Sequence, residues 1–392
     1  MKKLELDPKF EFIEAARFSE LLTSYPIENQ HLIKALYLPL MEQGSDQLVS
    51  NVHVDIELLQ APERVLGLVL PQIQTAHPEE SYVASPYGQY VDYGRYETAL
   101  ELGKLRWLNV LANWIFDVLG KICRWAKFDQ VVLVDNLLFS TNLYPQKPDY
   151  SLRDLRHFLQ KKFPDRAIVY RSICPQVYPE WFAELKSNGF KVVFSRQVYL
   201  LDAPGGAHRR KRALDIDSRL AAKQKHLRWT FLENPDDEQL ARILDLYNQL
   251  YLEKYARLNP QYTLAYLKNL TQGGLIQLKA LWHESKIVAF TGYFILDGVM
   301  INPLIGYDRS YPQKEGLYRL LTMETMLEAE KRGMLLNMSS GASHFKRLRG
   351  AEAQLEFNMV YDRHLPWWRR LPWALTRIIS IPTIWLVRRY GL

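Results

Sequence analysis

A basic run at residues 343–350 contains side chains suited to electrostatic and acid–base chemistry. Lys346, within this run, can bind a phosphate or stabilise negative charge that develops during a reaction. His344 and Asp308 are the nearest groups that can take a proton from an attacking amine. Each has a structural alternative: Lys346 and His344 can simply be solvated, and Asp308 can cap a turn.

The loop at residues 313–318 lies between an expected strand and an expected helix. It reads Gln313, Lys314, Glu315, Gly316, Leu317, Tyr318. The free N–H groups and the dipole at a helix N-terminus hold phosphate, and a glycine lets the phosphate approach the backbone. The loop therefore indicates a phosphate site, with an ordinary polar loop as the alternative.

Several other enzyme classes lack support in the sequence. It contains no His-Glu-x-x-His, no cysteine pair at metal-ligand spacing, no Walker loop and no Gly-x-Ser-x-Gly. Cys123 and Cys174 are isolated, so we expect small buried apolar residues rather than a disulfide framework. We expect neither a metal enzyme nor a serine hydrolase.

The composition predicts a globular protein of two domains. The chain has 392 residues, 48% of them hydrophobic and 24% charged, and a domain averages about 150 residues. Lys2 and Lys3 near the start of the sequence have no apolar run behind them, which predicts neither a signal peptide nor an anchor. A cytoplasmic location is expected.

The net charge of +7 is concentrated in two zones. Residues 205–228 carry eight basic and two acidic residues, and residues 363–392 carry six arginines and no acid. Two compact basic zones favour two separate anionic contacts. A solvated charged face is the alternative for the first zone.

The tail at residues 363–392 is also rich in tryptophan, with four of the ten in the chain. Its least charged stretch spans about 25 Å as a helix, which is short of the ~30 Å hydrocarbon core of a membrane. Tryptophan and arginine beside isoleucine are typical of a segment lying on an anionic membrane surface. We therefore predict a peripheral position at the inner face of the cell membrane, with docking onto the protein's own core as the alternative.

Periodicity predicts the elements that position these residues. In the second half we expect helices at 234–258 and 262–270, three antiparallel strands at 275–282, 287–296 and 299–305, a helix at 316–331, and strands at 334–338 and 355–361. In the first half we expect a hairpin at 52–70, an aromatic strand and loop at 81–94, a long helix at 99–125, and then strands at 131–134, 167–170 and 191–201 separated by helices near 153–162 and 178–189. Two related α/β units follow, with residues 205–230 as a basic connector.

The element order of the second half resembles the GNAT acyltransferase fold. Gln313 and Gly316 match that family's pyrophosphate loop, Q/R-x-x-G-x-G/A, whereas Tyr318 stands where a small residue is usual. The resemblance implies acetyl-coenzyme A or a longer acyl-coenzyme A as co-substrate, bound by the loop and by the strand backbone at Ile305 and Gly306. Pro303 lacks an N–H and cannot polarise the acyl carbonyl.

Most of the chain resembles the Fem-type (FemAB) and CelD-type proteins, which are tandem GNAT units. The matching segments are Ser85-Pro86-Tyr87 with Tyr93-Gly94, the arginine-rich run at 209–219, and residues 343–350, which resemble the aromatic-Lys-x-x-aromatic-Gly motif at the end of these proteins. The Asp-aromatic-Gly strand usual before that motif is replaced by residues 336–341, so a carboxylate is missing. Tyr87, Tyr90 and Tyr93 can line an acceptor groove between the units, although aromatic-rich strands are more often core.

These resemblances imply an α/β protein of two GNAT-like units, at 1–204 and 231–362, and the composition of residues 363–392 predicts a membrane-interface tail after them. The expected activity is transfer of an acyl group from acyl-coenzyme A to an amine or hydroxyl of a membrane-proximal or envelope-related acceptor. Aminoacyl-tRNA remains open as the donor, because Fem-type proteins use it and residues 205–228 could contact RNA phosphates. A non-catalytic membrane-associated scaffold also remains open.

Overall fold

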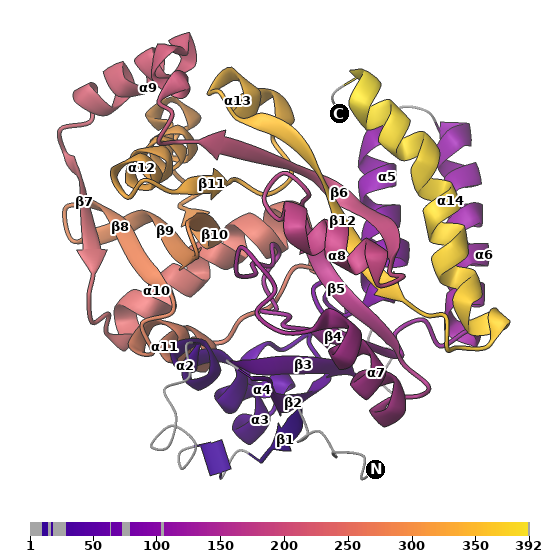
Figure 1. Cartoon of the computed structure of the whole chain (residues 1–392). Coiled ribbons are helices and arrows are strands. Elements are labelled where there is room, and N and C mark those ends of the chain that lie inside the picture. Colours follow the sequence, from indigo (N-terminus) through magenta and orange to yellow (C-terminus); the bar gives the residue numbers. More distant parts are fainter. Residues whose placement is uncertain are drawn as a thin grey trace.

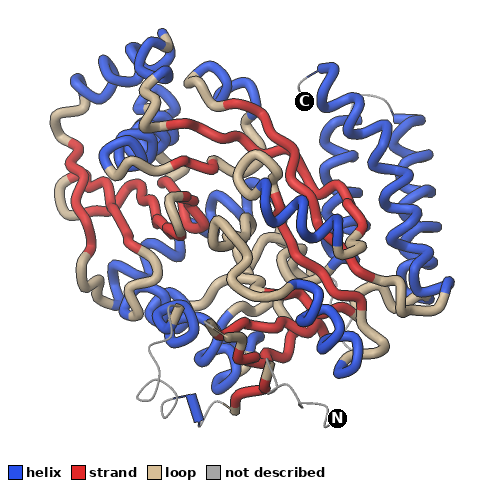
Figure 2. Tube along the Cα trace, in the orientation of Figure 1, coloured by secondary structure: helices blue, strands red, loops and turns tan. Residues whose placement is uncertain are grey.

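A single twisted sheet of twelve strands organises the protein (Figure 1). The computed structural model describes residues 10–14, 17–18, 29–62, 64–72, 79–102 and 106–390. The strands follow the order β1-β2-β3-β4-β5-β12-β6-β11-β10-β9-β8-β7. Helices lie along the sheet, and Figure 2 shows how the connecting loops gather around its centre.

The sheet consists of two halves with the same pairing pattern. The first half is β1 (Glu11–Ile13), β2 (Val54–Gln60), β3 (Val65–Pro71), β4 (Val131–Val134), β5 (Ala167–Ile173) and β12 (Glu352–Tyr361). The second is β7 (Leu227–Leu232), β8 (Gln277–His283), β9 (Lys286–Leu296), β10 (Val299–Tyr307), β11 (Leu335–Asn337) and β6 (Lys191–Asp202). In each half the fourth and fifth strands are parallel and the other neighbours antiparallel. Two related α/β units are therefore confirmed.

The two units exchange their last strands. β6, from the first half of the chain, pairs with β11, and β12, from the end of the chain, pairs with β5. β6 and β12 also pair with each other along most of their length. The sheet thus runs without interruption across the expected boundary near residue 205, and the division into units at 1–204 and 231–362 stays a prediction.

Helices connect the strands of both units. The first unit contains α2 (Gln30–Leu32), α3 (Leu38–Gln43), α4 (Ser45–Leu48), α5 (Gly94–Leu102), α6 (Arg106–Trp125), α7 (Leu152–Lys162) and α8 (Pro179–Ser187). The second contains α9 (Arg212–Lys223), α10 (Asp237–Asn248), α11 (Leu264–Gln272), α12 (Leu317–Lys331) and α13 (Ser343–Leu348), and α14 (Trp367–Tyr390) follows. β3 and β4 are joined through α5 and α6, whereas the equivalent β9 and β10 are joined by the tight turn Asp297-Gly298, in which both residues have positive φ.

The expected elements of the second half are confirmed within a few residues. The helix expected from residue 234 begins later, because Asp236 rather than Asn234 is its N-cap and forms a capping box with Gln239. The basic connector contains a helix, α9, which we did not predict because we interpreted this segment only by its charge.

The aromatic strand expected at residues 81–94 is wrong. Turns there lead into a helical segment, Gly88–Tyr93, that continues into α5. The Ser85 hydroxyl accepts a hydrogen bond from the Gly88 N–H at 2.7 Å, and Asp129 accepts one from the Tyr87 N–H at 2.7 Å. These acceptors satisfy N–H groups at the start of the helical segment, which a pattern of tyrosines alone does not reveal.

The tail forms α14, which lies beside α5 and α6 (Figure 1). Its Trp373 is 1% exposed and packs on Phe128, with ring centroids 4.4 Å apart. One side of this helix therefore packs on the protein's own core, which was the alternative to a membrane contact. The opposite side exposes Trp367, Ile378, Ile379 and Ile381.

Candidate functional site

A cavity of about 270 Å³ opens where β10 and β11 separate. The two strands pair in parallel only from Val299 to Ile301 on β10. Beyond that point the register of β10 with β9 shifts between Ile301 and Leu304, so Asn302 and Pro303 form a bulge. Both bulge residues line the cavity.

Both units contribute walls to this cavity. The first unit supplies Tyr82, Tyr93, Tyr96, Glu97, Thr141 and Arg196. The second supplies Asn302, Ile305, Tyr318, Asn337 and Lys346, among others. A concave space at a junction of two units, with aromatic walls and a few converging polar groups, is the usual form of a small-molecule site.

Lys346 is buried on the cavity wall, so the alternative that it is simply solvated is wrong. Its Nζ donates hydrogen bonds to the backbone carbonyls of Met338 (2.6 Å), Ser339 (3.2 Å) and Ser340 (2.7 Å). Ser339 and Ala342 have positive φ, so the loop that curls around the amine is in a strained conformation. Lys346 therefore holds the loop after β11 in the shape that closes the cavity.

Burial lowers the pKa of Lys346 to about 7, and the positive charge of Arg196 adds to this effect. Between this value and the ordinary value of 10.5, the unfolded chain binds a proton that the folded chain has released. Stability must rise with pH wherever the unfolded state binds more protons. We therefore expect the free energy of unfolding of the wild type to rise from pH 7 to pH 10 relative to Lys346→Met, by at most about 1.4 kcal/mol per pH unit.

This difference can be measured by urea unfolding of both proteins at several pH values. The comparison cancels the titration of every group that the two proteins share. A difference that does not change from pH 7 to pH 10 would show that Lys346 keeps its proton in the folded state.

The loop predicted to bind phosphate directly precedes α12. Gly316 has φ +66° and precedes the first turn of α12, and a Cβ at this position would lie 2.5 Å from the Leu220 Cδ2 atom. The first N–H groups of α12 lack carbonyl acceptors within the helix. Gln313 and Lys314 are exposed in front of it, and Tyr318, the second residue of α12, lines the cavity. The start of α12 therefore borders both the loop and the cavity.

The basic helix α9 packs beside this loop. Gln224, at the end of α9, donates a hydrogen bond to the Glu315 carboxylate at 2.8 Å. Buried Asp217 accepts hydrogen bonds from Arg319 Nε (2.6 Å) on α12 and Arg349 Nε (2.7 Å) after α13. This triad fixes α9 to both elements that border the cavity.

Two proposed proton acceptors lie apart from the cavity. The Asp308 carboxylate accepts hydrogen bonds from Lys286 (2.8 Å), Arg242 and both the N–H and hydroxyl of Ser310. Burial alone would raise the pKa of Asp308, but these partners outweigh it and hold the pKa well below its usual range. His344 is exposed on α13. The structural alternatives named above describe both residues better than a role as a base.

Ile305 and Gly306, the expected backbone contacts, differ in position. Ile305 lines the cavity. Gly306 faces α10 instead, because a Cβ there would come within 2.6 Å of the Leu246 backbone. This glycine allows α10 to pack closely on β10.

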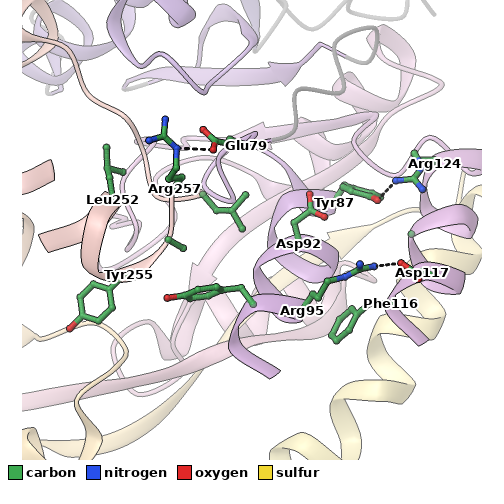
Figure 3. A pocket seen from close by; sticks show the side chains of 14 residues that line it. Glu79, Tyr87, Asp92, Arg95, Phe116, Asp117, Arg124, Leu252, Tyr255 and Arg257 are labelled. Carbon is green, nitrogen blue, oxygen red and sulfur yellow. Dashed lines mark hydrogen bonds and ion pairs between the residues drawn. The ribbon is translucent and has the colours of Figure 1, made fainter. Parts of the chain in front are cut away.

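The three acceptor tyrosines are in three different places. Tyr93 lines the cavity, with its ring centroid 4.6 Å from that of Tyr82. Tyr87 lines a second hollow (Figure 3), where its hydroxyl accepts a hydrogen bond from Arg124. Tyr90 packs edge-on against Trp373 beneath α14 and accepts a hydrogen bond from Asn358 at 2.9 Å. Tyr90 therefore belongs to the core.

The second hollow, of about 530 Å³, adjoins the cavity, because Tyr96 and Tyr255 line both. Figure 3 shows Phe116, Asp117 and Arg124 of α6 on one side of the hollow and Leu252 and Tyr255 on the other. The hollow thus lies next to the cavity, on the side of α6.

Sequence reasoning missed several cavity residues. Arg196 on β6 donates hydrogen bonds to Glu356 (2.9 Å) and to Thr141 (2.8 Å). Asn302 donates one to Thr291 at 2.7 Å. The available signal was the Asn302-Pro303 pair, because a proline inside a strand usually marks a bulge. Glu97 gave no signal in the sequence.

Searches of the described residues found no cluster of three or more histidine, cysteine, aspartate or glutamate side chains that could hold a metal ion. No helix in the described part of the chain is long and apolar enough to cross a membrane. Cys123 and Cys174 are buried and unbonded, as expected.

Comparison with known families identifies the second unit. Residues 208–347 match the family described as an acetyltransferase (GNAT) domain. This range contains the phosphate loop, the parted strands β10 and β11, and Lys346. No curated protein matches the chain.

Several solved structures are similar to this chain at low identity. FemX is 8% identical, with a TM-score of 0.50 over 93% of this chain and 100% of that one. A tandem GNAT protein from the clavulanic acid biosynthesis pathway is 12% identical, with a TM-score of 0.38 over 90% of this chain and 98% of that one. The structure of L-PGS from Bacillus licheniformis is 16% identical, with a TM-score of 0.44 over 64% of this chain and 82% of that one.

Proposed function

We propose that the protein, whose residues 208–347 match the acetyltransferase (GNAT) domain family, transfers an acyl group from acyl-coenzyme A to an amine or hydroxyl acceptor. The observation that carries this proposal is that Tyr318, two residues after Gly316 at the start of α12, lines the cavity. Phosphates held at the start of α12 would place the thioester of the same molecule between β10 and β11.

The residues of the cavity suit the chemistry of acyl transfer. A tetrahedral intermediate carries negative charge on oxygen, and a donor in a water-poor site stabilises it strongly. Lys346 is the residue that we propose for this role or for binding a phosphate. Glu97, a carboxylate on the opposite unit, suits an acceptor that arrives as an ammonium ion. Positioning of the two substrates supplies much of the remaining rate enhancement.

Aminoacyl-tRNA remains the second candidate donor, favoured by the position of α9. Exposed basic residues of this helix, including Arg219 and Lys223, lie next to the phosphate loop. Such a surface attracts either the phosphates of coenzyme A or an RNA backbone. Thermal shifts with acetyl-coenzyme A and with aminoacyl-tRNA, each at two salt concentrations, distinguish the two.

Replacing Gly316 with aspartate is expected to weaken acetyl-coenzyme A binding at least about tenfold, because a negative charge and a side chain then occupy the phosphate position. The measurement is the rise in melting temperature with ligand concentration. Gly333→Asp is the matched control, since Gly333 ends the same helix with φ +68° and open space around it.

Gly316→Asp can also disturb folding, because its Cβ meets Leu220. Lys314→Glu, at an exposed position, changes the charge of the loop without that contact. Unchanged affinity in both folded variants would place the donor elsewhere.

We also propose that the acceptor is membrane-proximal and that the protein is peripheral at the inner face of the cell membrane. The support for this is the arginine- and tryptophan-rich composition of residues 363–392. The side chains of Trp385, Arg388 and Arg389, which entered that prediction, lie outside the described part of the structure. If neither donor binds, the non-catalytic scaffold becomes the better description.

A further inference from the structure

Helix α6 turns its apolar stripe toward solvent. Trp107 is 68% exposed and Trp114 is 62% exposed. Val110, Leu111, Ile115 and Val118 lie between and beside them at three- and four-residue spacing and are also exposed. A surface helix normally buries such a stripe against the core. The orientation of α6 is therefore the reverse of the usual one.

Helix α14 continues this apolar surface. The two helices lie side by side (Figure 1), and the rings of Trp125 and Trp368 are 5.5 Å apart. Trp367 is 67% exposed on α14, and Ile378 and Ile381 are exposed to a similar degree. We call the exposed side chains of Trp107, Val110, Trp114, Trp367, Ile378 and Ile381 the α6–α14 face. Contiguous apolar patches of this kind mark interaction sites.

Cations occur on the same two helices. Lys121 and Arg124 are exposed on α6, and Arg377 is exposed on α14. The exposed carboxylate of Asp117 pairs with Arg95 at 2.6 Å, which neutralises it. Indole rings prefer the headgroup level of a bilayer, and each basic residue near an anionic leaflet strengthens binding.

We infer that the α6–α14 face binds the surface of an anionic membrane. A second copy of the chain would pair this face with itself, which brings the same cations together. Anionic lipid instead offers both an apolar layer for the tryptophans and isoleucines and negative headgroups for Arg124 and Arg377. The proposed membrane contact thus includes not only the tail but also α6, which lies between β3 and β4 in the sequence.

Phe116, Gly120 and Arg124 line the second hollow from the side of α6 away from the exposed stripe, so docking in this way places the hollow one helix diameter, ~10 Å, from the leaflet. This step rests on the proposed acyl transfer. An acceptor held in the leaflet reaches the cavity through the hollow, past Tyr96 and Tyr255.

The test is sedimentation of the full chain with phosphatidylcholine vesicles, with and without phosphatidylglycerol, at low and high salt. We expect the wild type to pellet with the anionic vesicles and less so at high salt. Trp107→Glu/Trp114→Glu is expected to reduce partitioning at least about tenfold. Leu327→Glu is the matched control, since Leu327 is an exposed leucine on α12, and it should pellet like the wild type.

Thermal melts establish that each variant is folded, and the thermal shift with acetyl-coenzyme A measures the donor site in the same samples. A donor shift that persists while vesicle binding is lost supports docking by this face. Equal pelleting of the wild type and the double variant overturns the inference, as does failure of the wild type to pellet with anionic vesicles at low salt. A dimer that the double variant abolishes, without vesicle binding, assigns the face to a second copy and also overturns it.

Discussion

Replacing Lys346 with methionine is expected to lower turnover by at least about a hundredfold, the usual effect of removing a group that stabilises an oxyanion. Two losses combine in this variant. The positive charge on the cavity wall disappears, and the carbonyls of Met338, Ser339 and Ser340, which accept hydrogen bonds from the ammonium, lose their common partner. Methionine keeps most of the volume, so the change is chiefly one of polarity.

Stability should fall in the same variant, by about 1–3 kcal/mol, because buried carbonyls without partners are costly. This revises the expectation for an exposed lysine, whose removal would barely affect folding. The measurements are steady-state turnover with acetyl-coenzyme A and an amine acceptor, and urea unfolding at the same pH.

His344→Ala is the matched control, because His344 lies on the same short helix but is exposed. It should retain both stability and turnover. A folded Lys346→Met protein with wild-type turnover would remove Lys346 from the chemistry, and a loss of turnover in His344→Ala alone would restore His344 as the proton acceptor.

Replacing Asp217 with alanine is expected to destabilise the protein by about 3–5 kcal/mol, the typical effect of breaking a buried ion pair from one side. Asp217 is fully buried, and its loss leaves Arg319 and Arg349 without their shared carboxylate. Both guanidinium groups would keep charges that are now uncompensated. Because α9 borders the phosphate loop, donor binding should weaken as well.

Asp215→Ala provides the control, since Asp215 is an exposed aspartate two residues earlier on the same helix. Thermal unfolding compares the two variants, and the shift with acetyl-coenzyme A reports on the loop. Equal melting temperatures for the two variants would contradict a structural role for the triad.

Local chemistry determined much of this fold. The spacing of leucines and tyrosines defined α10 and α12, and the Asp297-Gly298 pair defined the turn between β9 and β10. Gly316, placed just before apolar residues at helical spacing, indicated the phosphate loop. A left-handed backbone conformation and the start of a helix both depend on only a few neighbouring residues. These signals act over a few residues, so a single sequence contains them completely.

Long-range packing decided which of the candidate residues form the site. Lys346 and His344 are two residues apart in one basic run, yet one is buried against the loop after β11 and the other is exposed. Asp308 could accept a proton as far as its residue type is concerned. In the structure, Arg242 and Lys286 from other elements form ion pairs with its carboxylate. Burial and pKa depend on neighbours that are distant in sequence, and residue types alone do not give them.

The arrangement of the units was likewise settled only by the tertiary structure. The strand pattern predicts β6 and β12, but it does not predict that each strand pairs with the half of the sheet formed by the other unit. Which strands pair depends on the packing of the whole sheet. The same holds for α6: its periodic apolar residues predict a helix with one apolar face, and that face normally turns inward. Which side faces the core depends on what packs against it, and here α5 and the segment around Tyr87 cover the other side.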